Sequence, residues 1–202
     1  MDANSPKSVN NQSLLVRSLE EHLDCLKTLL NTQLEEIQQT GDVICQTLLA
    51  GNKILLCGNG GSAADAQHIA AELVGRYERA RQAFPAIALT TDTSALTALS
   101  NDFGYEEVFS RQVLAHARKG DLLIAISTSG RSASIVRAVQ TAKELGCQTL
   151  ALTGGDGGEL APLCDHRLIV TAARTSRIQE AHITIAHLWC EMVDQSSVIS
   201  SK

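Results

Sequence analysis

The chain has 202 residues, of which 44% are hydrophobic and 19% charged, and its 17 basic and 22 acidic side chains give a net charge of -5. This composition provides enough apolar material for the core of about one domain and excludes wholesale disorder. The negative charge and the 3% aromatic content argue against direct nucleic-acid binding. No apolar run reaches the ~20 residues that cross a bilayer, and the N-terminus lacks a signal-peptide core. We therefore expect a cytoplasmic protein without a membrane partner, whose cysteines are mostly buried, reduced thiols.

Residues 1–50 are predicted to form a tail and an N-terminal helical extension. Apolar residues recur in steps of three and four from Leu15 to Ile37, which is typical of one face of a long helix. Gly41 is expected to end this helix, and Asp42 to begin a second helix that runs to Leu49. The apolar face needs a partner surface, which either the chain's own domain or another subunit can supply.

Residues 51–202 are predicted to form an α/β domain. Five short, continuous apolar segments are typical of strands that are buried on both faces. They span residues 53–57, 86–89, 121–126, 148–152 and 167–170. Helical patterns lie between and after them, near residues 62–80, 94–100, 106–118, 132–145 and 176–197. This alternation predicts a three-layer αβα fold with a five-stranded parallel sheet in the flavodoxin-like order 2-1-3-4-5.

The loops after the first and third strands are expected to bind phosphate. Both lead into helices at the point where a sheet of this order binds its ligand. Glycine amides, hydroxyl groups and helix N-termini together suit a phosphate monoester. The residues are Asn59, Gly60 and Gly61 in the first loop and Ser127, Thr128, Ser129 and Ser132 in the second. Alternatively, these loops only form turns and helix caps, with Ser62 and Ser132 as N-caps. Neither loop has the GxGxxG pattern or the Walker lysine, so the phosphate is expected to belong to the substrate.

Two helices carry side chains suited to acid–base or metal chemistry. His68 and Glu72 lie four residues apart and share one helix face, as a general base or a zinc site requires. A surface contact without function has the same spacing. The last helix contributes Gln179 and His187, which are ~12 Å apart along a straight helix. A capping box also explains Gln179. At this separation, a single metal ion could hardly bind both residues.

Several motifs resemble those of the bacterial phosphoheptose isomerases, a branch of the sugar isomerase (SIS) domain family. They are residues 57–62 (CGNGGS), 68–77 (HIAAELVGRY), 101–104 (NDFG), 127–132 (STSGRS), 152–158 (LTGGDGG) and 177–182 (RIQEAH). The resemblance implies a homotetramer with active sites between subunits and a bound zinc ion. It implies that the metal ligands are His68, Glu72, Gln179 and His187. The implied substrate contacts are Glu72, Gln179, Asn59, Gly60, Gly61, Asn101 and Asp102, with the phosphate on Ser127, Thr128, Ser129 and Ser132.

The resemblance also implies a reaction. These enzymes convert sedoheptulose 7-phosphate to D-glycero-D-manno-heptose 7-phosphate, the first step toward the heptose of lipopolysaccharide. A proton then moves through an enediol, and we expect Glu72 to be the base and His187 the acid.

A different function remains an alternative. A paralogue with the same fold is a scaffold that binds the bacterial replication initiator without catalysis, and residues 51–55, 85–89 and 157–160 resemble that branch. Glu72 and His187, which that branch lacks, favour the enzyme. A sugar-phosphate sensor that binds its ligand without turnover is a third possibility.

Overall fold

The strand order of the sheet places the two predicted ligand loops next to each other. The computed structural model describes residues 11–200, with side chains described through residue 196. The sheet is parallel with the order β2-β1-β3-β4-β5, which confirms the prediction. Its strands are β1 (Ile54–Gly58), β2 (Ala86–Ala88), β3 (Leu122–Ser127), β4 (Gln148–Gly154) and β5 (His166–Val170). Gly58 at the end of β1 is paired with Ile126 of β3, so the loops that follow these strands leave the sheet side by side.

Alternating strand residues form two apolar cores, one on each face of the sheet. Leu56 and Ile124 belong to one core, whereas Leu55 and Leu123 belong to the other. All four side chains are fully buried. Successive side chains of a strand point to opposite faces, so an unbroken apolar strand requires a helical layer on both sides.

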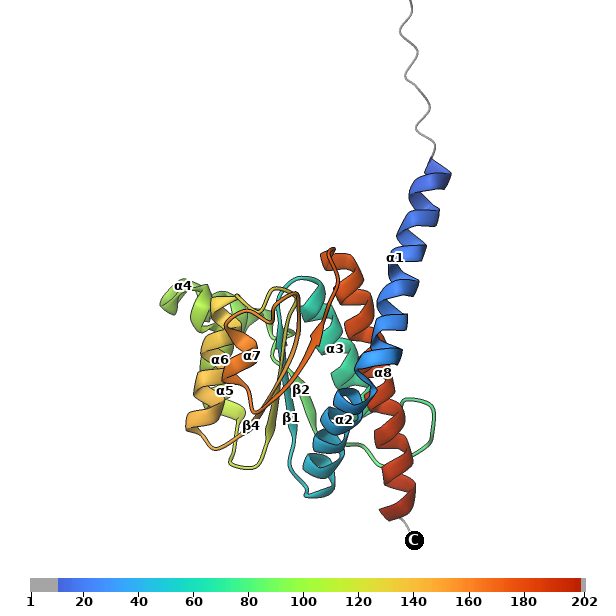
Figure 1. The fold of residues 1–202 in the computed structure, drawn as a ribbon. Helices are drawn as coiled ribbons and strands as arrows, with labels where there is room; N and C mark the ends of the chain where they lie inside the picture. Colours follow the sequence, from blue (N-terminus) through green and yellow to red (C-terminus); the bar gives the residue numbers. More distant parts are fainter. Residues whose placement is uncertain (1–10, 201–202) are drawn as a thin grey trace, which may run out of the picture.

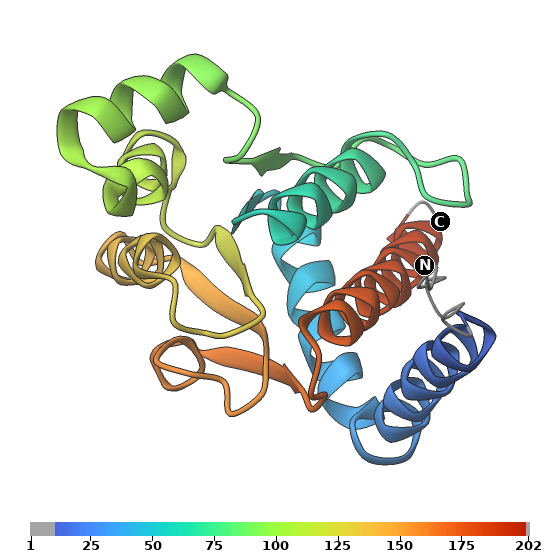
Figure 2. The same cartoon turned by 90° about the horizontal axis from the view of Figure 1, so that it is seen from above.

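Helices cover both faces, as Figure 2 shows from above. One face carries α1 (Asn11–Thr32), α2 (Leu34–Leu49), α3 (Gly61–Val74) and α8 (Thr175–Ser200). The other carries α4 (Thr93–Phe103), the 3-10 helix η1 (Tyr105–Glu107), α5 (Val108–His116), α6 (Ala133–Glu144) and the short α7 (Leu160–Leu163). Helix α1 lies outermost and packs on α8 and α2. The predicted three-layer αβα architecture is confirmed, and α7 is an addition that the sequence patterns did not indicate.

The break between the N-terminal helices was predicted at the wrong residue. Helix α1 ends at Thr32 and α2 begins at Leu34, so Gly41 lies inside α2. A Cβ atom on Gly41 would lie 2.6 Å from Cε of Met192 and 3.1 Å from Cδ1 of Trp189. Gly41 therefore allows α2 to pack closely on α8, and this tertiary contact outweighs the low helix propensity of glycine.

Helix α3 is shorter than the predicted helix over residues 62–80 and starts differently. It ends at Val74, and residues 75–85 fold back so that the buried Phe84 donates its N–H to the carbonyl of Leu73 at 3.1 Å. Ser62, the N-cap in the alternative interpretation of this loop, is instead the second residue of the helix. Gly60 occupies the N-cap position with a φ of 57°, a conformation that glycine adopts at little cost.

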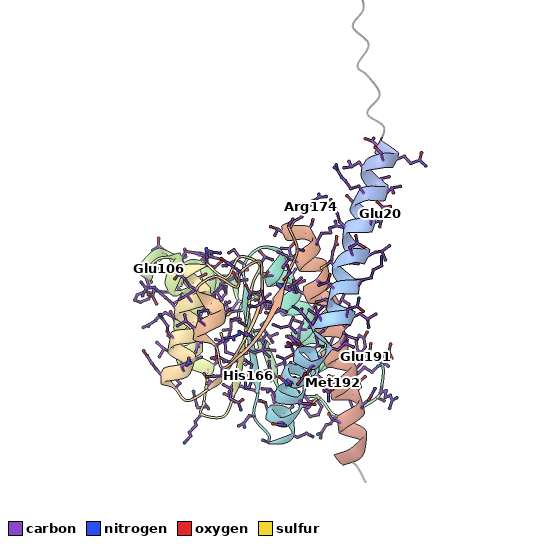
Figure 3. The ribbon with its side chains drawn as sticks, viewed as in Figure 1. Glu20, Glu106, His166, Arg174, Glu191 and Met192 are labelled. Carbon is purple, nitrogen blue, oxygen red and sulfur yellow. The ribbon has the colours of Figure 1, made fainter. Side chains whose placement is uncertain are left out.

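Helix α1 extends beyond the body of the protein (Figure 1). Its C-terminal half reaches the core through Cys25 and Leu29, while Leu15, Leu19 and Leu23 are 52–64% exposed. Arg174, the residue before α8, contacts Glu21 of α1 at 3.0 Å, and Figure 3 shows Arg174 near the α1 segment that carries Glu20. No helix within residues 11–200 is long and apolar enough to cross a membrane. All six cysteines are free and buried.

Candidate functional site

Helices α3 and α8 lie side by side and run in the same direction, which sets the geometry of the site (Figure 2). At the start of α3, Gly61 faces Gln179 of α8, and a Cβ atom on Gly61 would lie 2.5 Å from the Gln179 Nε2 atom. Further along both helices, His68 faces His187. Successive turns of α3 therefore meet successive turns of α8, because the two helices advance at the same rate per residue.

His68 and Glu72 in the C-terminal half of α3 converge with His187 in the middle of α8. The Nε2 atoms of His68 and His187 are 2.9 Å apart, and Oε1 of Glu72 lies 3.6 Å from Nε2 of His68. The ring of Tyr77 stacks on His187, with 5.4 Å between centroids and 25° between planes. The side chains of His68 and Glu72 are 44% and 22% exposed, so a substrate can reach them. The structure thus brings together three of the residues that the sequence singled out.

The donor types of this cluster suit a zinc ion, and the two histidine nitrogens lie close to the separation that zinc ligands have. Two imidazole nitrogens and a carboxylate oxygen are ordinary zinc ligands, and two ligands ~2.0 Å from a tetrahedral zinc ion are about 3.3 Å from each other. The two histidine nitrogens, at 2.9 Å, need to separate by only a few tenths of an ångström. Within the described part of the chain, no group of three or more His, Cys, Asp or Glu side chains already has metal-site geometry.

Among the described residues, Gln179 makes no contact with His68 or His187. Its amide lies against Gly61, and α8 runs without interruption from Gln179 to His187. Gln179 and His187 are therefore ~12 Å apart along α8, as expected for an uninterrupted helix.

The loop at residues 127–132 has the features of an anion site. The hydroxyl of Ser127 accepts the N–H of Gly130 at 3.2 Å and lies 3.4 Å from the hydroxyl of Ser132. Ser132 is the N-cap residue of α6, as the alternative interpretation of this loop expected, but its side chain makes no capping hydrogen bond. The hydroxyl groups and the N-terminus of α6 therefore meet where a phosphate can accept hydrogen bonds.

Asn59 connects the two ligand loops. Its Nδ2 donates to the hydroxyl of Ser134 in α6 at 3.1 Å, and its Oδ1 accepts the hydroxyl of Tyr105 at 2.7 Å. The side chain thus links the end of β1 to the helix that follows β3, as adjacent strands allow. Ser134 and Tyr105 were not among the predicted residues, because neither belongs to a glycine- or serine-rich loop before its helix.

Asn101 and Asp102 are not brought to the cluster within one chain. Both are exposed at the C-terminal end of α4, where the Asn101 Nδ2 donates to Asp102 Oδ1 at 2.9 Å. A nearby cavity of about 530 Å³ lies between β2, α4 and α5, and none of the predicted site residues lines it. Helix α4 belongs to the layer on the opposite face of the sheet from α3 and α8.

Asp65 is a residue near the cluster that the sequence reasoning missed. It precedes His68 by three residues on α3, and its Oδ2 is buried without a hydrogen-bond partner among the described residues. Burial raises the pKa of this carboxyl group to about 6, which the nearby His68 partly opposes. The sequence could have indicated Asp65 through its spacing of three residues from His68, because residues at i and i+3 share a helix face.

Comparison with known proteins agrees with this architecture. The model of the SIS domain family matches residues 19–154, which makes the chain a member of that family. The phosphoheptose isomerase of Aliarcobacter butzleri is 52% identical over 183 residues, which cover 91% of this chain and 97% of the relative. The solved phosphoheptose isomerase from Neisseria gonorrhoeae has a TM-score of 0.86 and 44% identity, covering 91% of this chain and 98% of that one. The one from Francisella tularensis has a TM-score of 0.89 and 35% identity, covering 93% and 100%. Within the SIS domain family, the chain belongs to the phosphoheptose isomerases, which are sugar-phosphate isomerases.

Proposed function

We propose that the protein converts sedoheptulose 7-phosphate to D-glycero-D-manno-heptose 7-phosphate by proton transfer through an enediol. The observation that carries this proposal is the meeting of Glu72 with His68 and His187 at the surface of α3 and α8. The high identity to proteins named phosphoheptose isomerases supports the same substrate. The product is then the first intermediate toward the heptose of lipopolysaccharide, and the reaction takes place in the cytoplasm.

Each residue of the site has a role in this mechanism. The carboxylate of Glu72 removes a proton from C1 of the ketose and returns it to C2. His187 protonates the carbonyl oxygen at C2 to give the enediol, and it recovers a proton from the C1 hydroxyl as the aldehyde forms. The hydroxyls of Ser127, Thr128, Ser129 and Ser132 bind the phosphate at the far end of the sugar. Residues 59–61, Asn101, Asp102 and Gln179 contact the hydroxyl groups between these ends. Phosphate binding then contributes to catalysis because it holds the reacting carbons beside Glu72.

His68, Glu72 and His187 are the residues that would hold zinc within one chain. Gln179, ~12 Å from His187 along α8, would join them only from a neighbouring subunit. Zinc, when bound, polarises the hydroxy-carbonyl unit of the substrate. Two imidazoles and one carboxylate are three protein ligands, the number that catalytic zinc sites commonly have, and they would leave a fourth position for a substrate oxygen. The 2.9 Å between the histidine nitrogens supports this assignment, because a zinc ion needs only a slightly larger separation.

We also propose that the active protein is a homotetramer with sites between subunits. Residues 1–50 supply the contact surface and residues 51–202 supply the SIS domain. The exposed leucines of α1 support this assembly, since a row of them on a projecting helix needs a covering surface. Asn101 and Asp102, which lie away from the cluster in one chain, would reach a site from a neighbouring subunit.

Incubation of the purified protein with sedoheptulose 7-phosphate, with zinc and after chelation, tests the proposal directly. We expect the heptose 7-phosphate product, and we expect Glu72→Gln to lower turnover at least about 10²-fold while the fold survives. Glu144→Gln, at an exposed glutamate at the end of α6, is the matched control and should retain full turnover. Normal turnover by Glu72→Gln would exclude Glu72 as the base. Binding of the replication initiator without any product would support the scaffold instead.

A further inference from the structure

Arg81 closes the C-terminal end of helix α3, where Glu72 is located. The loop of residues 75–85 carries its guanidinium back to the helix, where Nη2 donates to the carbonyl of Glu72 at 2.7 Å and Nη1 to that of Leu73 at 2.9 Å. A helix leaves its last carbonyls without intrahelical partners and has a partial negative charge there, so a buried cation is well placed. The Arg81 side chain is only 3% exposed, and its Cζ atom lies 5.1 Å from the ring centroid of Phe84.

Asp194 of α8 holds this arginine. One carboxylate oxygen accepts the Arg81 Nε at 2.7 Å, and the other accepts the backbone N–H groups of Glu78 and Arg79, each at 2.9 Å. The Asp194 side chain is also only 3% exposed. A buried ion pair with this many hydrogen bonds fixes its two elements in one geometry, because each partner would be costly to leave unpaired.

The ion pair belongs to the same helix contact as the site. Asp194 follows His187 by seven residues and therefore lies on the same face of α8, two turns further along. Contacts between α3 and α8 thus occur at Gly61 with Gln179, at His68 with His187, and at the end of α3 through Arg81 and Asp194.

We propose that Arg81 and Asp194 are positioning residues for catalysis, which set the register of α3 against α8 and so the placement of Glu72 relative to His187. This inference rests on the proposed role of Glu72 as the base. Neither side chain touches the substrate. The planar guanidinium is essential because it binds the carbonyls of Glu72, Leu73 and Gln82 and a carboxylate at once. A lysine ammonium cannot reproduce this planar arrangement of donors.

Arg81→Lys tests the proposal with a matched control. We expect kcat to fall about 10–10²-fold with KM changed less than about threefold, because a small misplacement of the base slows the chemical step and leaves phosphate binding intact. Asp194→Asn should show the same pattern more weakly, and it replaces Arg81→Lys if that variant does not fold. The control is Lys53→Gln, which breaks the pair between Lys53 and the buried Asp121 at the N-terminal ends of β1 and β3, outside the contact between α3 and α8. Asp121 resembles Asp194 in also accepting backbone N–H groups, from Lys53 and Arg118.

A double-mutant cycle separates positioning from general destabilisation. In the Glu72→Gln background, Arg81→Lys should reduce the residual kcat less than twofold, because no base remains to be positioned. An equal loss in both backgrounds, or an equal kcat loss in Lys53→Gln at matched stability, overturns the inference. A kcat within twofold of the parent in folded Arg81→Lys or Asp194→Asn also overturns it. Normal turnover by Glu72→Gln alone would instead refute the proposed function on which the inference rests.

Discussion

His182 offers a test of how the core holds helix α8 in place. The side chain is fully buried, and its Nε2 lies 3.1 Å from the carbonyl oxygen of Thr153 in β4. A carbonyl only accepts, so Nε2 carries the proton of the neutral ring. The Nδ1 atom is buried and has no hydrogen-bond partner within the part of the chain that the structure describes. A second proton would place an unpaired charge in the core, and burial accordingly lowers the pKa of His182 from 6.5 to about 4.

The sign of the resulting pH dependence follows from proton linkage. The unfolded state binds a proton at His182 below about pH 6.5, whereas the folded state does so only near pH 4, so stability is lost as the pH falls between these values. For these two pKa values, the free energy of unfolding drops by about 2 kcal/mol between pH 8 and pH 5 from His182 alone. This loss is in addition to that from any other titrating group.

Urea unfolding at fixed protein concentration, followed by circular dichroism at pH 8 and pH 5, measures this loss. His182→Gln is the variant of choice, because its amide can still donate to Thr153 but does not titrate in this range. We expect the pH-dependent loss in the variant to be smaller than that in the parent by about 2 kcal/mol. Equal losses in the two proteins would show that His182 is not held neutral by the core.

Three further outcomes are expected. All six thiols are buried, and burial raises the pKa of each. A thiol reagent at pH 8 should therefore label none of them in the native protein and all six in urea. Rapid labelling of the native protein would contradict this expectation. In Gly61→Ala, the new Cβ would lie 2.5 Å from Nε2 of Gln179 and should displace this amide. We expect kcat/KM to fall about tenfold or more at unchanged stability. Unaltered kinetics would refute a role for Gln179. Leu19→Glu combined with Leu23→Glu on α1 should yield a smaller species in light scattering; an unchanged mass would exclude this face as the contact surface.

Local residue patterns predicted the sheet and its loops because the signals are short-range. Strands buried on both faces must be continuously apolar, and their alternation with helices allows few parallel topologies. The glycine- and hydroxyl-rich loops after β1 and β3 could be placed together for the same reason. The end of α3 could not be predicted, since it depends on Arg81 binding the carbonyls of Glu72 and Leu73 from a loop that folds back. Gly41 misled the prediction because the space it provides is filled by Met192, a residue far away in the sequence.

The sequence by itself determined the αβα class, the strand order and the residue types available for phosphate and proton chemistry. Whether His68 and His187 meet was decided only by the tertiary structure. They are 119 positions apart, and no local pattern encodes the parallel packing of α3 on α8 that brings their Nε2 atoms to 2.9 Å. The same packing leaves Gln179 at the first turn of α3. Helical periodicity specifies which face a side chain occupies, but the register between two helices depends on the side chains that pack between them.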